Sequence, residues 1–298
     1  MKKEYDKVFL NQYGYYELKQ KPTVEERKKE FEEIYYQQIG GPYQKEYTQD
    51  ELEFKNIKLE QRKYIYEKNF GREITGLSLL DIGCGEGFTL RYFKELNMHV
   101  TGIDFSSWAI EHQNKEMMQY FIQGDAEKIL PLLIEKNNKY DVINMDQVLD
   151  MMVNPEKVLI MCKSLLGENG ILVIKVANNY SQLQTTLLEN GQLKEEYWLD
   201  DPGHPRYFNK EGLIRYLSNM GYDCIDFYGE SFIDFNLINP RTNYYENPEC
   251  GKDDYKARIQ LETMLHNISV KKSLEVYKLL ADMGFGREII GVFKLRRG

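Results

Sequence analysis

The chain has 298 residues, of which 42% are hydrophobic and 29% charged, a balance that excludes a membrane protein, a collagen-like chain and a highly charged disordered chain. The formal net charge is −8, and residues 1–75 carry as many basic as acidic side chains, so all the excess acid lies in the remainder. No basic stripe suited to a phosphate backbone is visible, and we expect neither nucleic acid nor a membrane as a partner.

The segment 1–75 predicts a helical N-terminal cap. Thr23 and Glu26 have the spacing of a capping box, so we expect a helix from about residue 24 to 37. A Gly-Gly-Pro break follows at residues 40–42, and a second helical pattern covers about 49–69. We therefore expect residues 1–75 to form a helical cap rather than a sheet domain.

From about residue 77, short apolar runs alternate with helical stretches. Strands separated by helices with short connections predict a parallel, doubly wound α/β sheet. Residues 76–230 and 287–298 are expected to form this core, interrupted by a helical insertion at 231–286. The strands are expected at 77–81, 99–104, 120–123, 140–145, 170–176, 222–228 and 288–295.

A glycine-rich loop follows the first of these strands. Gly83, Gly85 and Gly87 alternate with Cys84 and Glu86, which lets backbone amides approach a ligand because no Cβ intervenes. A dinucleotide fingerprint would need a glycine at the sixth position, where Phe88 stands, so a pyrophosphate site is not predicted. The acid before the loop, Asp81, is placed to face an ammonium group.

Acidic residues also end the next strands. Asp104 is placed to accept both hydroxyls of a ribose, and Asp125 with Ala126 to border an adenine. The other interpretations are a helix N-terminal acid for Asp104 and a capping residue for Asp125. At the fourth strand edge Asp146 is expected to contact the ligand or to be an ordinary solvated strand end. Further expected cofactor contacts are Phe105, Met145 and Gln147.

These motifs resemble those of the class I S-adenosylmethionine-dependent methyltransferases over residues 77–230. L-L-D-I-G-C-G-E-G resembles their first motif, T-G-I-D-F-S their ribose-binding second, Q-G-D-A-E their adenine-side third and Y-D-V-I-N-M-D-Q their fourth. The resemblance implies a Rossmann-like seven-stranded sheet with an antiparallel last strand, and S-adenosyl-L-methionine as cofactor, with S-adenosyl-L-homocysteine as product. Many small-molecule members carry a Glu-His pair where this chain has Asp150-Met151.

A second candidate segment is Trp198 to Phe208, which resembles the H-x-x-Y-F segment found before a helix in many of these enzymes. His204 is the candidate general base, with Tyr207 beside it, because imidazole titrates near neutral pH. Arg206 is placed to grip a phosphate or carboxylate, and Trp198 to contact substrate. The alternatives are loop packing for His204, a surface ion pair for Arg206 and ordinary packing for Tyr207 and Trp198.

The acceptor pocket is expected to use the two segments outside the core. Tyrosines of the first segment offer an apolar ring with a polar tip, although ordinary helix packing is the favoured explanation for them. The insertion is expected to close as a lid over the acceptor, with a dimer interface as its alternative role, so that the protein is a monomer or a homodimer. The residues expected to line the pocket are Tyr13, Tyr15, Tyr16, Tyr35, Tyr36, Tyr43, Arg241, Tyr244 and Tyr245.

The cysteines and the first residues bear on the compartment. Cys84, Cys162, Cys224 and Cys250 form no C-x-x-C pair, so we expect reduced thiols, a cytoplasmic setting and no metal site. The charged first residues show no secretory signal. The leading hypothesis is methyl transfer to oxygen, nitrogen or carbon of a small polar molecule. A weak resemblance of residues 13–26 to N-terminal extensions of bacterial methyltransferases adds a sugar or surface-glycan precursor as the acceptor.

Two other functions stay open at this point. One is a different reaction on the same cofactor, which product analysis would separate. The other is a catalytically silent partner that binds the cofactor or serves assembly, because Met151 replaces the histidine that many relatives carry.

Overall fold

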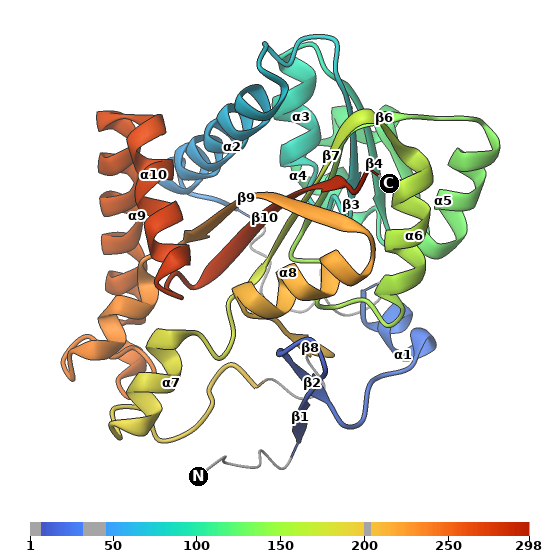
Figure 1. Cartoon of the computed structure of the whole chain (residues 1–298). Helices are drawn as coiled ribbons and strands as arrows, with labels where there is room; N and C mark the ends of the chain where they lie inside the picture. Colours follow the sequence, from blue (N-terminus) through green and yellow to red (C-terminus); the bar gives the residue numbers. More distant parts are fainter. Residues whose placement is uncertain (1–6, 32–45, 200–203, 298) are drawn as a thin grey trace.

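The structure, a computed structural model, describes residues 7–31, 46–199 and 204–297. A seven-stranded sheet crosses the centre of the molecule in the order β5-β4-β3-β6-β7-β10-β9, and a three-stranded sheet in the order β1-β2-β8 lies below it in Figure 1. The strands of the large sheet are β3 (Ser78–Ile82), β4 (His99–Asp104), β5 (Phe121–Gln123), β6 (Tyr140–Asp146), β7 (Leu166–Ala177), β9 (Tyr222–Glu230) and β10 (Glu288–Leu295).

The register of the large sheet fixes where a ligand can bind. Strands β5, β4, β3, β6 and β7 run parallel to one another, whereas β10 is antiparallel to both β7 and β9. The predicted antiparallel last strand is therefore confirmed. Strands β4 and β5 lie on one side of β3, and the next strand in the chain, β6, pairs with the other side of β3. In a sheet of this topology the ligand crevice lies where the strand order reverses, here at the carboxyl ends of β3 and β6.

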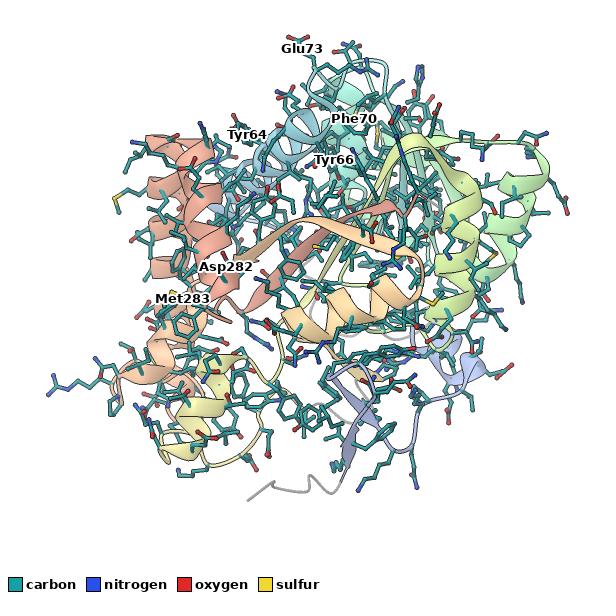
Figure 2. All side chains as sticks on the ribbon, in the orientation of Figure 1. Tyr64, Tyr66, Phe70, Glu73, Asp282 and Met283 are labelled. Atoms are coloured by element: carbon teal, nitrogen blue, oxygen red, sulfur yellow. The ribbon has the colours of Figure 1, made fainter. Side chains whose placement is uncertain are left out.

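Helices cover both faces of the sheet, and each face has its own apolar core. Leu80 and Ile82 of β3 face the cluster packed by α5, α6 and α8, whereas Leu79 faces the cluster packed by α2, α3 and α10. This alternation follows from the two-residue period of a strand. Side chains fill the space between these layers in Figure 2. The helices are α3 (Phe88–Glu95), α4 (Trp108–Gln113), α5 (Ala126–Glu135), α6 (Pro155–Leu165), α7 (Gln182–Glu189) and α8 (Lys210–Asn219).

The N-terminal segment is helical in part. The capping box predicted at Thr23 is present and starts α1 (Val24–Lys29), while residues 32–37 of the expected helix lie outside the described part of the chain. Helix α2 (Gln49–Phe70) matches the second predicted helix. The expectation of a helical cap without strands is wrong for the first residues, because β1 (Val8–Leu10) and β2 (Tyr16–Leu18) form a hairpin. Strand β2 also pairs with β8 (Arg206–Tyr207).

The insertion between β9 and β10 is helical, as predicted. Helices α9 (Gly251–Ile268) and α10 (Val270–Asp282) form the left edge of the molecule in Figure 1 and pack on α2 and β9. Two short 3-10 helices, Ile233–Ile238 and Pro248–Cys250, lead into them. Over the described residues, every helix is too short or too polar to cross a bilayer.

Candidate cofactor and active site

The glycine loop lies where β3 ends. Gly83 has φ +74°, and a Cβ there would meet Val148 Cγ2 at 2.3 Å, so only glycine fits this position. The Gly83 amide donates to Ile103 O (2.7 Å), and the Gly85 amide donates to Asp104 Oδ2 (2.9 Å). Strand β4 thus holds the loop through its last two residues.

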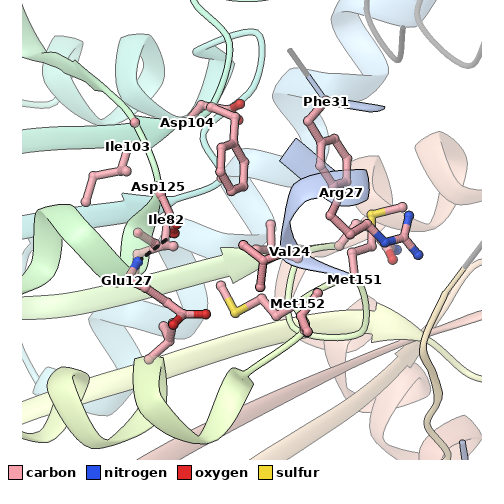
Figure 3. A pocket seen from close by; sticks show the side chains of 18 of the residues that line it. Val24, Arg27, Phe31, Ile82, Ile103, Asp104, Asp125, Glu127, Met151 and Met152 are labelled. Atoms are coloured by element: carbon pink, nitrogen blue, oxygen red, sulfur yellow. Dashed lines mark hydrogen bonds between the residues drawn. The ribbon is translucent and has the colours of Figure 1, made fainter. Parts of the chain in front are cut away.

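A cavity of about 140 Å³ opens beside this loop, and we call it the first cavity. Its wall comes from the carboxyl ends of β3, β4 and β6, the turns after β5 and β6, and helix α1 (Figure 3). Of the predicted cofactor residues, it is lined by Gly83, Asp104, Phe105, Asp125, Ala126, Asp146 and Gln147. Sequence motifs from four separate strand ends therefore meet in one place.

Two of the acids that line the first cavity, Asp104 and Asp125, are held differently. Asp104 is 8% exposed and accepts hydrogen bonds from the amides of Gly85 (2.9 Å) and Ser106 (3.2 Å). A carboxylate oxygen can accept more than one hydrogen bond, so these bonds orient Asp104 without excluding a ribose hydroxyl. Asp125 accepts from the Glu127 amide (2.9 Å) and caps α5. The capping interpretation of Asp125 is therefore correct, and its side chain also borders the cavity.

A smaller, polar cavity of about 40 Å³ adjoins the first, and we call it the second cavity. Asp146 lines both cavities. Gln61, Arg62 and Tyr66 of α2 line the second cavity and are 2%, 7% and 0% exposed. Both amide atoms of Gln61, Nη1 of Arg62 and the hydroxyl of Tyr66 have no hydrogen-bond partner among the described residues. Buried polar atoms normally have partners, so this cavity is built for a polar ligand group or for water.

Asp81 lies within β3 beside the second cavity. It is 3% exposed, and Asn144 donates to its Oδ1 (2.7 Å). Burial raises the pKa of Asp81 to about 7, and the carboxylates of Asp146 and Asp104 act in the same direction. A cation brought next to Asp81 would favour its charged form. This is the behaviour expected of an acid that receives an ammonium group.

The predicted catalytic segment lies against the turn that follows β6. His204 Nε2 is 3.7 Å from Asp150 Oδ2. Arg206 is 3% exposed, and its guanidinium donates to the carbonyl oxygens of Met152 (2.6 Å) and Val153 (3.3 Å). Arg206 therefore fastens β8 to the cavity wall, a task the sequence did not indicate. Its proposed grip on a substrate anion stays a prediction.

Several other predicted site residues line neither cavity. Met145 is fully buried in the core, and Cys84 packs behind the loop, where burial raises the pKa of its thiol. A third apolar cluster around β2, β8 and α7 holds the aromatic candidates Tyr16, Trp198, Tyr207, Tyr244 and Tyr245, while Tyr15 and Tyr13 pack in the core against Tyr216. Arg241 is exposed. Tyr35, Tyr36 and Tyr43 lie outside the described residues.

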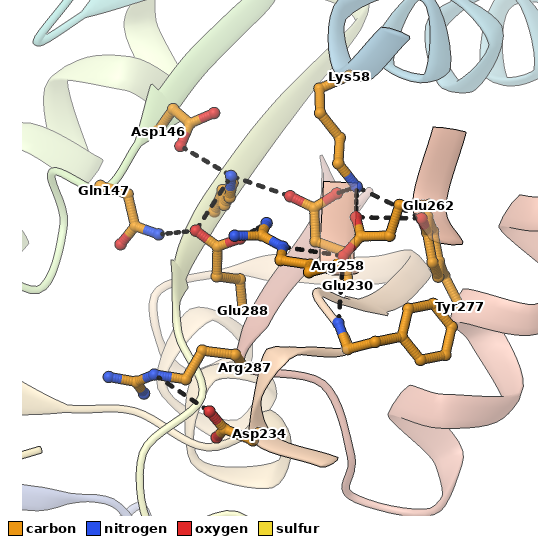
Figure 4. A network of polar contacts seen from close by, with 12 residues as sticks. Lys58, Asp146, Gln147, Glu230, Asp234, Arg258, Glu262, Tyr277, Arg287 and Glu288 are labelled. Carbon is orange, nitrogen blue, oxygen red and sulfur yellow. Dashed lines mark hydrogen bonds and ion pairs between the residues drawn. The ribbon is translucent and has the colours of Figure 1, made fainter. Parts of the chain in front are cut away.

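Charged side chains form a buried network on the other side of Asp146, which we call the charge network (Figure 4). Lys175 Nζ lies 3.7 Å from Asp146 Oδ1, 2.9 Å from Glu230 Oε1 and 3.3 Å from Glu288 Oε1. Gln147 donates from Nε2 to Glu288 Oε1 (2.9 Å). The strand ends of β6, β7, β9 and β10 are thereby tied together.

Helices α2 and α9 complete the charge network. Lys58 of α2 contacts Glu262 (2.5 Å) and Glu230 (3.1 Å), and Arg258 contacts Glu262 (2.9 Å) and Glu288 (3.5 Å). Burial disfavours the charged form of Lys58, but the two carboxylates outweigh burial and raise its pKa. Burial likewise opposes ionisation of Glu230, but Lys175 and Lys58 lower its pKa. Sequence analysis missed this network because its members are far apart in the chain.

The described part of the insertion does not line the first cavity. Arg258 of α9 contacts Glu288, which accepts a hydrogen bond from the cavity-lining Gln147, and Leu274 of α10 lines the second cavity. The expected lid role of residues 231–286 therefore stays a prediction.

Comparisons with known proteins agree with this site. A family model described as a methyltransferase domain matches residues 58–226. A ubiquinone biosynthesis O-methyltransferase of Glaesserella parasuis is 27% identical over 200 residues, which cover 63% of this chain and 80% of that protein. One of Pasteurella multocida is 27% identical over 195 residues, covering 60% of this chain and 73% of that protein.

Two solved structures align with most of the chain. A SAM-dependent methyltransferase from Archaeoglobus fulgidus has 16% identity and a TM-score of 0.49, covering 83% of this chain and 100% of that one. The plantazolicin methyltransferase BamL, solved in complex with a triazolic desmethylPZN analog and SAH, has 21% identity and a TM-score of 0.49, covering 83% of this chain and 88% of that one.

Proposed function

Because this chain belongs to the methyltransferase domain family, we propose that it transfers a methyl group to a hydroxyl oxygen of a small molecule with an apolar body. It is a class I methyltransferase, and its cofactor is S-adenosyl-L-methionine. The acceptor atom and the acceptor class are the finer parts of this proposal. The observation that supports both is the first cavity, which combines acids at the strand ends with an apolar wall.

The residues present fit the cofactor. The first cavity offers Asp104 to the ribose hydroxyls, Asp125 to the adenine side, and the backbone of Gly83 to the chain between nucleoside and amino acid. The second cavity offers Arg62 to a carboxylate, and Asp81, which accepts a hydrogen bond from the cavity-lining Asn144, is the proposed partner of an ammonium group. When bound, S-adenosylmethionine supplies an electrophilic methyl group on a sulfonium sulfur.

The acceptor is proposed to enter beside α1 and the turn after β6. Val24, Phe31, Met151, Met152 and Val153 line this part of the first cavity. A wall of this kind gains free energy by covering apolar surface, and it offers few groups for the hydroxyls of a sugar. The curated relatives named above are O-methyltransferases, which supports oxygen as the acceptor atom. A sugar or surface-glycan precursor is the second candidate.

Positioning does most of the work in such a transfer. Holding donor and acceptor in line converts a bimolecular step into an effectively unimolecular one. A hydroxyl must also lose its proton, and His204 is the proposed base that takes it. Tyr207 is fully buried, with its ring centroid 6.5 Å from that of His204, and its proposed role is to support the histidine.

Calorimetry with S-adenosylhomocysteine tests the cofactor site. Replacing Asp104 by alanine leaves the ribose hydroxyls without an acceptor, and we expect affinity to fall about 10- to 100-fold, the equivalent of one charge-assisted hydrogen bond. Asp223→Ala is the matched control, because Asp223 is an exposed acid paired with Arg296 away from both cavities. Equal affinity in parent and Asp104→Ala protein would refute the placement.

Transfer of a labelled methyl group to a panel of acceptors tests the acceptor class. We expect phenols and catechols with an apolar substituent to be methylated on oxygen, as mass spectrometry of the products would show. Faster transfer to free or nucleotide-linked sugars would overturn the apolar acceptor. Binding of S-adenosylhomocysteine with no transfer to any acceptor would favour the catalytically silent partner.

A further inference from the structure

Asp150 is a buried acid in the turn that forms the acceptor side of the first cavity. It is 1% exposed, and the next three residues, Met151, Met152 and Val153, line the cavity. Its carboxylate points to His204, with Oδ2 at 3.7 Å from Nε2, and the imidazole is 23% exposed. A buried acid thus stands behind a partly exposed histidine at the edge of the proposed acceptor site.

The backbone keeps these two side chains together. Arg206 joins β8 to the turn through Met152 O (2.6 Å) and Val153 O (3.3 Å). Strand β8 is in turn paired with β2, where Tyr207 lies opposite Tyr16. His204 stands two residues before this anchored strand, so its position relative to Asp150 is set from both sides.

We propose that Asp150 is a positioning residue that fixes the tautomer of His204 and stabilises its protonated form during methyl transfer. The proposal rests on the function proposed above and deepens it. It also accounts for the replacement of a Glu-His pair by Asp150-Met151, because the histidine arrives here from a different part of the chain.

The chemistry follows from which nitrogen faces the acid. A carboxylate beside Nε2 keeps the proton on Nε2, so the lone pair of the neutral ring lies on Nδ1. As the acceptor oxygen forms its bond to the methyl carbon, the hydroxyl proton passes to Nδ1. The electron pair of the breaking carbon–sulfur bond stays on sulfur. The resulting imidazolium is stabilised by the charge of Asp150, as in other acid–histidine pairs.

Other charges near the pair act in known directions. The Arg206 guanidinium opposes a positive charge on His204, but it is engaged by two carbonyl oxygens and lies 4.0 Å from Glu156 Oε1. The aromatic neighbour is the Tyr207 ring. Asp223→Asn serves as the control, because Asp223 is an exposed acid paired with Arg296 away from both cavities.

Proton NMR of the whole chain tests the pair without any substrate. The protein has four histidines, and His204→Gln identifies the signal that belongs to His204. An acid at this distance is expected to raise the midpoint of the His204 titration above the ordinary value of about 6.5, and Asp150→Asn to lower it by about 1 to 3 pH units. Asp150→Glu should restore most of the shift. A midpoint at or below about 6.5 in the parent would overturn the pair even if Asp150→Asn fails to fold.

The pH profile of turnover tests whether the pair acts in catalysis. We expect His204→Gln to lower kcat about 10²- to 10⁴-fold with nearly unchanged affinity for S-adenosylhomocysteine. Asp150→Asn should move the acid limb of kcat/KM to lower pH by the same amount as the NMR midpoint, while Asp223→Asn should not. Wild-type turnover in His204→Gln would make the pair structural and overturn the inference, although methyl transfer would stand. A chain that methylates no acceptor would refute the proposed function, while the NMR result would still report on the pair.

Discussion

The two sides of Asp146 are built on opposite principles. On one side, the first cavity is an apolar space with a few acids, made by turns that directly follow β3, β4, β5 and β6. On the other side, the charge network packs charged side chains from α2, α9 and four strand ends into the interior. The cavity is open to a ligand, whereas the charged groups of the network form ion pairs with one another.

This difference shows how one strand end can serve both binding and architecture. Asp146 Oδ1 faces Lys175, and Oδ2 lies 3.6 Å from Arg62 in the second cavity. Lys175 holds Asp146, and Glu288 holds Gln147, on the side that faces the network. Both side chains can therefore contact the cofactor in the first cavity without first losing conformational freedom. Preorganisation of this kind lowers the cost of binding.

The largest expected effect comes from breaking the charge network at Glu262, which is fully buried between Lys58 and Arg258. Glu262→Ala leaves two buried cations with one carboxylate each, and we expect it to lower the free energy of unfolding by about 3–5 kcal/mol in urea titrations. Glu275→Ala, an exposed acid on α10, is the control and should change stability by less than about 0.5 kcal/mol. Equal stability of the two variants would contradict the network.

The next largest effect is expected on the cavity side, at Gly83. Gly83→Ala places a methyl group against Val148 and strains a positive φ, so we expect affinity for S-adenosylhomocysteine to fall at least about tenfold. Gly76→Ala is matched in backbone, with φ +77° and nothing within 4 Å of the added carbon. Gly76→Ala should lower the free energy of unfolding by about 1 kcal/mol, as the positive φ also requires of Gly83→Ala, but should keep full affinity for S-adenosylhomocysteine. Equal loss of affinity in both variants would mean that strain alone is responsible.

A third prediction concerns Asp81, whose pKa of about 7 lies above that of an unfolded aspartate. Between about pH 4 and pH 7 the folded chain binds the Asp81 proton more tightly than the unfolded chain. The stability that this proton contributes is therefore complete at low pH and is lost as pH rises to about 7. Relative to the parent, Asp81→Asn should gain about 2 kcal/mol of stability in urea titrations as pH rises from about 5 to about 8. A constant difference between the two proteins over this range would contradict the raised pKa.

Cofactor binding should report on the same proton. An ammonium group beside Asp81 favours the carboxylate, so binding of S-adenosylhomocysteine near pH 6 is expected to release up to about one proton. Calorimetry in buffers of different ionisation enthalpy measures this release. Asp81→Asn removes the titrating group and should abolish it, whereas release that persists in Asp81→Asn would assign the proton elsewhere.

The smallest expected effect is at Arg241, which the sequence placed in the acceptor pocket and the structure places on the surface. Arg241→Ala should change the free energy of unfolding by less than about 0.5 kcal/mol and KM for the acceptor by less than about twofold. A large rise in KM without loss of stability would instead support the predicted lid role of the insertion.

Local patterns carried the sequence predictions that the structure confirms. The sheet, the capping box at Thr23 and the grouping of Gly83, Asp104 and Asp125 follow from motifs that lie at strand ends or helix starts. Arg62 and Gln61 were missed because nothing near them in the chain indicates that α2 packs beside Asp146. A signal was present: Gln61 stands four positions from both Ile57 and Ile65, on the buried face of α2, where a polar residue is unusual.

Aromatic residues were the harder class to predict. Tyr15, Tyr207 and Trp198 are nearly fully buried, and their rings pack against Phe208 and Tyr180. Tyrosine serves equally in a core and at a wet surface, so composition alone cannot separate the two roles. Whether these rings are buried depends on how the hairpin of β1 and β2 packs. Its strands have three residues each, too few to show the alternation of buried and exposed side chains in the sequence.

The place of β10 in the sheet bears on how the chain folds during synthesis. Strand β9 is made first, yet within the large sheet it pairs with β10 alone, and the whole insertion separates the two. Until β10 emerges, β7 presents an open edge and β9 has no sheet partner, which is the state most prone to wrong pairing. The helices between them lengthen this interval but add little to the entropy of closing the sheet, because that cost grows only with the logarithm of loop length. The growing chain therefore exposes an unfinished sheet until its final strand inserts between two that were already made.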